Sequence, residues 1–235
     1  MAYIYEYIRT RGAKPLYFEE HYNRLEDLSR DIFMTSLPIS REELYKSIVR
    51  RLEVAGYAST ATNAVCVRIS PFIQEATITI EEILYDDFSL RALRPESYIF
   101  GASGESITKK TSVRSSLLEF NRSTAQITDS GVAIWATEQG EVIAIDGASV
   151  VAVFEDEIRF SNYGCDLEFD IAFEEMSKVA ESVTRGTIFV EELTKAKELI
   201  GIDYRGVLAV ESFGSHLFMD ITAEKIATKI SEVEV

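Results

Sequence analysis

Hydrophobic and polar positions alternate at the start of the chain and then recur at helical spacing. The stretch YIYEYIRTR at 3–11 alternates in the way that is typical of a β-strand. Between 16 and 33, Leu25, Leu28 and Ile32 return every three or four residues, which places them on one face of a helix. The pattern therefore predicts a strand followed by an amphipathic helix.

A second helix is expected to begin after Ser40. Ser40 and Glu43 have the three-residue spacing of a capping box, in which hydroxyl and carboxylate satisfy the first backbone amides of a helix. Leu44, Ile48 and Leu52 then share one helical face. The sequence predicts a helix that buries this face.

Two strand-like runs and a polar break complete the first part of the chain. The runs at 64–70 and 76–84 alternate as strands, and the break YDDFS follows at 85–89. We expect a domain boundary at this break. The predicted domains are a small N-terminal α+β domain at 1–86 and a larger C-terminal α+β domain at 87–235 that carries a candidate lysine.

Strands and helices do not alternate regularly in the second part. The expected elements are a helix at 113–127, strands between 131 and 161 with hairpin turns at Glu138-Gln139-Gly140 and Glu155-Asp156, a helix at 171–183, strands at 187–192 and 207–212 with a short helix between them, and a last helix at 222–232. The order argues against a doubly wound parallel sheet. It predicts an α+β fold in two halves.

Charge and composition exclude several classes of function. The net charge is −15, which argues against nucleic acid as the main partner because phosphate binding needs a basic surface. Hydrophobic residues make up 46% of the chain, yet no apolar run is long enough to span a bilayer and the first residues do not resemble a signal peptide. The two cysteines show no metal or redox spacing. These features predict a cytoplasmic protein without a membrane partner.

The chemistry is expected to use lysine, arginine, tyrosine and carboxylates. The chain has no GxGxxG, P-loop, GxSxG or HExxH motif, and it has only two histidines, His21 and His216. Lys109 and Lys110 stand side by side where the helix at 113–127 begins. They are either solvated side chains at a helix entrance, or one of them bonds covalently to a cofactor.

Four stretches share motifs with a known family. They are Tyr5-Glu6-Tyr7-Ile8-Arg9 with Gly12, Pro15 and Glu20-His21-Tyr22-Asn23-Arg24-Leu25; Lys110-Thr111-Ser112-Val113-Arg114; residues 140–147; and residues 210–215. The first resembles the opening of the class IV aminotransferases, the fold-type IV pyridoxal-phosphate enzymes. The second resembles the K-T-T-x-R of the aminodeoxychorismate lyase branch. The resemblance implies the two-domain fold of D-amino-acid aminotransferases.

The resemblance also implies a cofactor, a function and a set of site residues. The cofactor would be pyridoxal 5'-phosphate, and the substrate an amino acid or amino-chorismate-like molecule, handled by a lyase or an aminotransferase homodimer. Lys110 would hold the cofactor as an internal aldimine and move the proton at the substrate. Arg24 would bind the phosphate, Asp146 would pair with the ring nitrogen, and Tyr5 and Ser212 would line the cofactor site.

Each of these residues also has a purely structural interpretation. Lys110 and Arg24 can be solvated side chains, Asp146 can be a turn residue before Gly147, and Tyr5 a half-buried strand residue. Where the family has G-I-T-R before a helix, residues 164–170 read GCDLEFD, and carboxylates there would repel a phosphate. The alternative function is therefore a degenerate homologue that no longer binds the cofactor and acts as a non-catalytic binding or structural protein.

Overall fold

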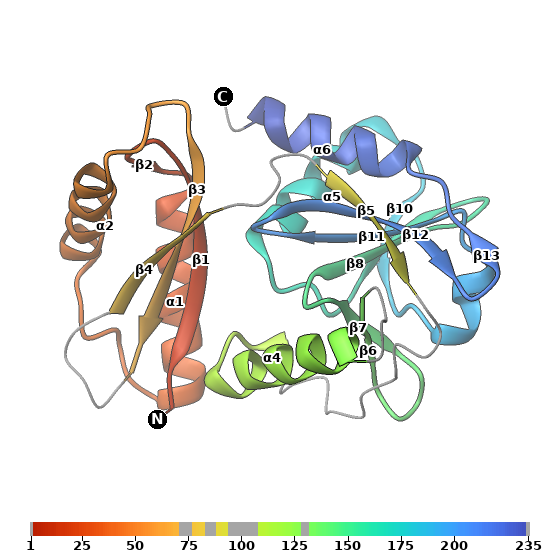
Figure 1. Cartoon of the computed structure of the whole chain (residues 1–235), viewed down its shortest axis with the longest axis horizontal. Helices are drawn as coiled ribbons and strands as arrows, with labels where there is room; N and C mark the ends of the chain where they lie inside the picture. Colours follow the sequence, from red (N-terminus) through yellow and green to blue (C-terminus); the bar gives the residue numbers. More distant parts are fainter. Residues whose placement is uncertain (1, 71–76, 83–87, 94–107, 128–131, 234–235) are drawn as a thin grey trace. The chain divides into compact units, whose positions relative to one another are not determined.

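The chain divides into two compact units in a computed structural model. The structure describes residues 2–70, 77–82, 88–93, 108–127 and 132–233. The first unit is Met1–Asp86 with Lys109–Val113, and the second is Asp87–Thr108 with Arg114–Val235. Figure 1 shows the elements of both units coloured along the sequence.

The first unit is an antiparallel sheet of order β2-β1-β3-β4 that packs against two helices. Its elements are β1 (Ile4–Arg11), β2 (Lys14–Pro15), α1 (Phe18–Phe33), α2 (Arg41–Ala55), β3 (Thr62–Ile69) and β4 (Thr77–Glu82). Ile4 and Ile8 of β1 meet Leu25 of α1 and Ile48 of α2 in the core. The period-2 pattern of the strand and the period-3.6 pattern of the helices thus bury one shared face.

Both predicted helix signals of α2 are present. The Glu43 amide donates to the Ser40 hydroxyl at 3.3 Å and the Ser40 amide donates to the Glu43 carboxylate at 3.2 Å, so the predicted capping box is confirmed. Leu44, Ile48 and Leu52 are buried as expected.

The short segment that carries Lys110 pairs with the edge of β1. The Tyr5 amide donates to the Lys110 carbonyl at 2.9 Å, and the Ser112 amide donates to the Tyr3 carbonyl at 2.9 Å. The lysine was predicted in the second domain, because it follows the boundary expected at the break at 85–89. That prediction is wrong, because backbone pairing with β1 places Lys110 in the first unit, and helix α4 (Ser112–Ile127) starts there before it continues into the second.

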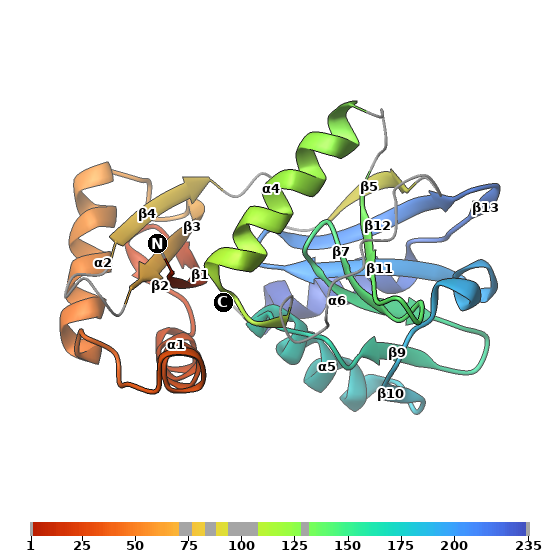
Figure 2. The same cartoon turned by 90° about the horizontal axis from the view of Figure 1, so that it is seen from below.

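The second unit is built around a seven-stranded sheet with helices on one face. Its strands run in the order β10-β9-β8-β11-β12-β13, with β5 paired to β12. The elements are β5 (Phe88–Leu93), β6 (Ile134–Ala136), β7 (Val142–Ile145), β8 (Ser149–Val153), β9 (Ile158–Ser161), α5 (Leu167–Val179), β10 (Val183–Gly186), the 3-10 helix η1 (Val190–Lys195), β11 (Glu198–Asp203), β12 (Gly206–Phe213), β13 (His216–Leu217) and α6 (Ile221–Val233). Helices α5 and α6 pack on one face of the sheet, and the β6–β7 hairpin packs on the other together with η1. Figure 1 shows the two helices and the hairpin on opposite sides of the strands, and Figure 2 shows the strands from the hairpin side.

Three predicted elements of this unit are corrected by the structure. Helix α5 spans Leu167–Val179 instead of 171–183. The strand predicted at 187–192 is not formed, because β10 ends at Gly186 and the 3-10 helix η1 begins at Val190. Strand β11 at Glu198–Asp203 lies where the short helix was predicted, between 192 and 207. Strand β11 is buried on both faces between β8 and β12, so its sequence lacks the alternation by which a half-buried strand is predicted. The predicted hairpins β6–β7 and β8–β9 are confirmed.

Within the described ranges, no helix combines the length and apolar character needed to cross a membrane. The same residues contain no group of three or more histidine, cysteine or carboxylate side chains placed to hold a metal ion.

Candidate functional site

A buried polar cluster surrounds Lys110 in the first unit. Lys110 is 5% exposed, and its Nζ donates to Oε1 of Glu6 at 3.1 Å. Nδ1 of His21 lies 2.9 Å from the same oxygen. Glu6 stands between Ile4 and Ile8 on the face of β1 that α1 covers, and α1 supplies His21. The packing of α1 on β1 therefore brings an ammonium and an imidazole to one buried carboxylate.

The electrostatics of this cluster favour an ionised Glu6. Burial raises the pKa of Glu6, but Lys110, His21 and Arg24 together outweigh burial and hold that pKa below its usual range. An ionised carboxylate only accepts hydrogen bonds, so the His21 tautomer that fits the contact carries its hydrogen on Nδ1. The same carboxylate favours the charged ammonium form of Lys110.

The neighbouring lysine lies in a different environment. Nζ of Lys109 is 3.6 Å from Oδ2 of Asp31 on α1, and both side chains are partly exposed. The two adjacent lysines thus have separate partners, Lys109 at the surface and Lys110 in the buried cluster.

Arg24 and Tyr5 also lie in the first unit. Arg24 is half-buried on α1, three residues after His21, and its charge helps to lower the pKa of Glu6. Tyr5 is buried, packs edge to face on Tyr7 with ring centroids 5.6 Å apart, and is joined to Lys110 through the backbone. Because successive side chains of a strand point to opposite faces, the Tyr5 ring belongs to the face of β1 away from Glu6.

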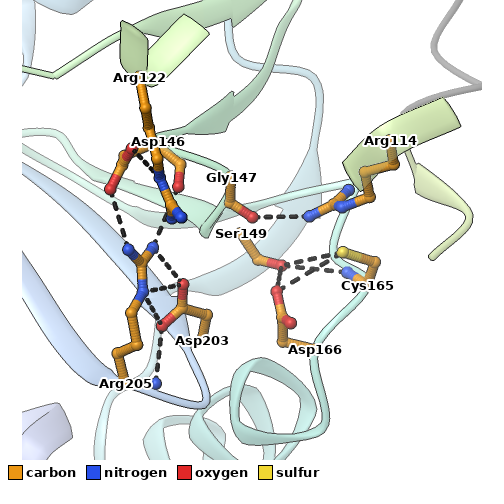
Figure 3. Close-up of polar contacts among 9 residues, drawn as sticks. All are labelled: Arg114, Arg122, Asp146, Gly147, Ser149, Cys165, Asp166, Asp203 and Arg205. Carbon is orange, nitrogen blue, oxygen red and sulfur yellow. Dashed lines mark hydrogen bonds and ion pairs between the residues drawn. The ribbon is translucent and has the colours of Figure 1, made fainter. Parts of the chain in front are cut away.

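In the second unit, Asp146 lies in the turn between β7 and β8 and is held by two arginines. Arg205 Nη1 donates to its Oδ2 at 3.0 Å, and Arg122 Nε donates to its Oδ1 at 3.2 Å (Figure 3). Arg205 also donates to the Asp146 carbonyl at 3.0 Å and to Asp203. Burial raises the pKa of Asp146, but Arg205 and Arg122 outweigh it and lower that pKa. The carboxylate is therefore ionised and fixed in place.

Gly147 occupies a backbone conformation in this turn that other residues rarely adopt, so its replacement tests the turn. Its φ is 81°, and a Cβ would lie 2.3 Å from Cδ2 of Leu118. We expect Gly147→Ala to destabilise the protein by about 2–4 kcal/mol, because alanine is strained at this left-handed φ and its Cβ would clash with Leu118. Gly140→Ala is the matched control, because Gly140 has the same φ with no atom within 4 Å, and should cost only about 1–2 kcal/mol. If urea unfolding gave the same loss of unfolding free energy for Gly147→Ala and Gly140→Ala, the Leu118 contact would have no role.

The start of α5 holds two buried carboxylates. Asp166 is the residue before the helix and is 3% exposed, and the Ser149 hydroxyl donates to its Oδ2 at 2.8 Å (Figure 3). The Cys165 amide donates to the same hydroxyl at 3.0 Å, and Glu168 in the first turn is also buried. A helix N-terminus favours negative charge, and here the protein places its own carboxyl groups at that position. This end of α5 therefore does not fit an external phosphate.

The structure does not bring Ser212 and Asp146 together. Ser212 lies near the end of β12, where it pairs with Leu217 of β13. Asp146 is bound by Arg205, which directly precedes the other end of β12 at Gly206. At about 3.3 Å per residue, the two ends of this strand are about 20 Å apart.

Glu6, His21 and Arg205 are site residues to which the sequence patterns gave no role. Glu6 is a polar residue at a core position of a strand, and His21 lies on the apolar stripe of a helix. Such positions are signals of a buried polar contact, but they do not identify the partner. Arg205 follows β11 in a turn, where an arginine is unremarkable in sequence.

The comparisons with known proteins find the fold among solved structures. Neither a family model nor a curated protein matches the sequence. A protein from Thermotoga maritima assigned as a branched-chain amino acid aminotransferase matches with a TM-score of 0.80 at 17% identity, over 98% of this chain and 85% of that one. A Legionella pneumophila protein assigned as a 4-amino-4-deoxychorismate lyase matches with a TM-score of 0.80 at 11% identity, over 98% and 90%. The chain has the fold of the class IV aminotransferases.

A third fold-type IV structure contains the cofactor. It is the pyridoxal-phosphate-bound form of a hypothetical aminotransferase from Mycobacterium tuberculosis, with a TM-score of 0.76 at 13% identity, over 99% of this chain and 89% of that one. The predicted resemblance and the α+β fold class are confirmed. At this level of identity the likeness concerns the fold-type IV architecture, so the chemistry rests on the residues of this chain.

Proposed function

We propose that the chain is a pyridoxal-phosphate-dependent enzyme of the aminotransferase or aminodeoxychorismate lyase type, with Lys110 as the residue that attaches the cofactor. The observation that carries the proposal is the buried position of Lys110, whose Nζ lies 3.1 Å from Glu6. A lysine that reacts with carbonyl compounds is typically shielded from water and held by charged neighbours. Structures with this fold include a pyridoxal-phosphate-bound form, which supports the choice of cofactor.

Other residues are proposed to bind the phosphate and the ring of the cofactor. When bound, pyridoxal phosphate supplies an electron sink for bonds at the substrate's α-carbon. Arg24 offers a guanidinium suited to a phosphate, which matters because the start of α5 is acidic. Asp146 offers an ionised carboxylate for a ring nitrogen and Tyr5 a pocket wall, whereas Ser212, at the other end of β12 from Arg205, does not reach the same ring. Lys110 moves the substrate proton.

The test of the function is an absorption spectrum. We expect the purified protein to develop a yellow band when it is mixed with pyridoxal phosphate, because a lysine amine that condenses with this aldehyde absorbs visible light. A protein that gives no band under conditions in which it is folded would overturn the proposal. The substrate, expected to be an amino acid or an amino-chorismate, the homodimer and the cytoplasmic location stay predictions.

A second candidate function is favoured by the start of α5. Asp166 and Glu168 are both buried there, and a fold-type IV homologue that had lost the cofactor would tolerate carboxylates at this position. Such a protein would act as a non-catalytic binding or structural protein. The absorption test separates the two candidates. A homologue that has lost the cofactor should give no yellow band and no measurable binding of pyridoxal phosphate.

Replacing Asp166 tests whether its charge limits cofactor affinity. We expect Asp166→Asn to bind pyridoxal phosphate about five to thirty times more tightly, since a charge at a helix N-terminus is worth about 1–2 kcal/mol when partly buried. Asparagine keeps an oxygen that can accept from Ser149. Asp170→Asn is the control, because its carboxylate is paired with Arg185 at 2.6 Å and is more exposed. Equal affinities of all three proteins by calorimetric titration would show that the charge at Asp166 does not oppose the phosphate.

A further inference from the structure

The protonation state that Glu6 favours for Lys110 differs from the one that a reactive lysine needs. A lysine attacks a carbonyl only as the neutral amine, whereas the Glu6 carboxylate 3.1 Å away favours the ammonium. Release of the proton to water would leave the buried Glu6 carboxylate without its contacting ammonium, which is costly. The buried pair thus needs an internal route for the proton.

We propose that Glu6 is the proton acceptor of Lys110 and that His21 is a positioning residue that adjusts this transfer through its contact with Glu6. In the step, an N–H bond of the Lys110 ammonium breaks and an O–H bond forms on Oε1 of Glu6. An ion pair becomes a neutral amine beside a neutral acid, and no net charge enters or leaves the cluster. The need for a neutral amine rests on the proposed function, but the transfer itself concerns the protein alone.

The geometry gives the two partners distinct effects. Oε1 of Glu6 is shared, with Lys110 Nζ at 3.1 Å and His21 Nδ1 at 2.9 Å. An N–H from His21 stabilises the ionised carboxylate and so weakens Glu6 as a base. Loss of that N–H would leave more negative charge on Oε1 facing the ammonium and so keep Lys110 protonated to higher pH, whereas loss of the carboxylate would free the amine.

The pKa of Glu6 is set by burial and by the described residues Lys110, His21 and Arg24. Arg24 on α1 acts on Glu6 from the same helix as His21. On β3 the residue paired with Glu6 is Val67, which carries no charge. Helix α2 contributes Leu44, Ile48 and Leu52 to this core. Because Glu6 is the carboxylate in contact with Lys110 Nζ, its removal is expected to change the protonation of Lys110.

The test measures the Lys110 amine directly in the cofactor-free protein. Nitrogen-15 NMR of labelled lysine side chains gives the midpoint pH at which each ammonium loses its proton, and the resonance missing from Lys110→Arg identifies Lys110. We expect Glu6→Gln to lower the Lys110 midpoint by about one to three pH units. An unchanged midpoint in a folded Glu6→Gln protein would overturn the proposal.

Further variants separate this effect from a general loss of packing. His21→Leu is expected to raise the Lys110 midpoint, and His21→Asn, which retains a side-chain N–H, to restore it toward the wild-type value. Asp31→Asn removes the carboxylate that faces Lys109 and should leave Lys110 unchanged. If Glu6→Gln does not fold, Glu6→Asp retains the charge at a greater distance and must still lower the midpoint. Absence of a yellow band with pyridoxal phosphate would refute the enzyme but not this transfer.

Discussion

Lys110→Ala is expected to abolish the yellow band that the protein gives with pyridoxal phosphate, whereas Lys109→Ala is expected to retain it. The physical reason is the difference between two neighbouring amines. Lys110 is buried beside Glu6, and Lys109 is a surface residue near Asp31. Absorption spectra at equal protein concentration check the result, and borohydride reduction followed by peptide mass spectrometry locates the modified lysine.

Folding must be controlled in this series, because removal of Lys110 leaves the Glu6 carboxylate without its ammonium partner. Such a loss costs about 3–5 kcal/mol when the pair is buried. Lys110→Arg is the matched control, since it keeps a positive charge for Glu6 but has no primary amine. A band that survives in Lys110→Ala or in Lys110→Arg would show that another amine binds the aldehyde.

The elements that the sequence predicts correctly are those with a local signal. Helices α1 and α2 bury one face each, and Ile4 and Ile8 of β1 lie on the face that these helices cover, so the apolar residues recur with the period of the element. Strand β11 is buried on both faces and carries no such period, and it was mistaken for a helix. Helix α5 begins at Leu167, earlier than the predicted start at 171, and Glu168 lies in its first turn. An acidic first turn in fact favours a helix N-terminus.

The candidate site could be predicted only in part for the same reason. Lys110 could be named from its local motif, but its partner Glu6 is 104 residues away in the sequence. The contact requires β1, α1 and the segment before α4 to be packed together, which no local pattern encodes. The ion pair between Arg205 and Asp146 likewise joins two turns that are 59 residues apart. Residue type indicates the chemistry that is available, and tertiary pairing decides which groups meet.

The second prediction with a large effect concerns the ion pairs of Arg205 with Asp146 and Asp203. Arg205→Ala is expected to lower the free energy of unfolding by about 3–5 kcal/mol, because it leaves two buried carboxylates, Asp146 and Asp203, without their shared guanidinium. Arg122→Ala removes the other partner of Asp146. The Arg122 side chain is 45% exposed, against 11% for Arg205, so its loss should cost only about 0–1 kcal/mol.

The pH dependence of the Arg205→Ala effect provides an independent check. The folded-state pKa of Asp146 lies below its ordinary value of 3.8, because Arg205 and Arg122 outweigh burial. A lowered pKa contributes stability that is present above the ordinary value and is lost as the pH falls through the folded value. The difference between wild type and Arg205→Ala in urea unfolding should therefore be largest near neutral pH and shrink below about pH 4. A difference that stayed constant down to pH 2 would mean that Arg205 stabilises the turn by packing and not through the ionised carboxylate.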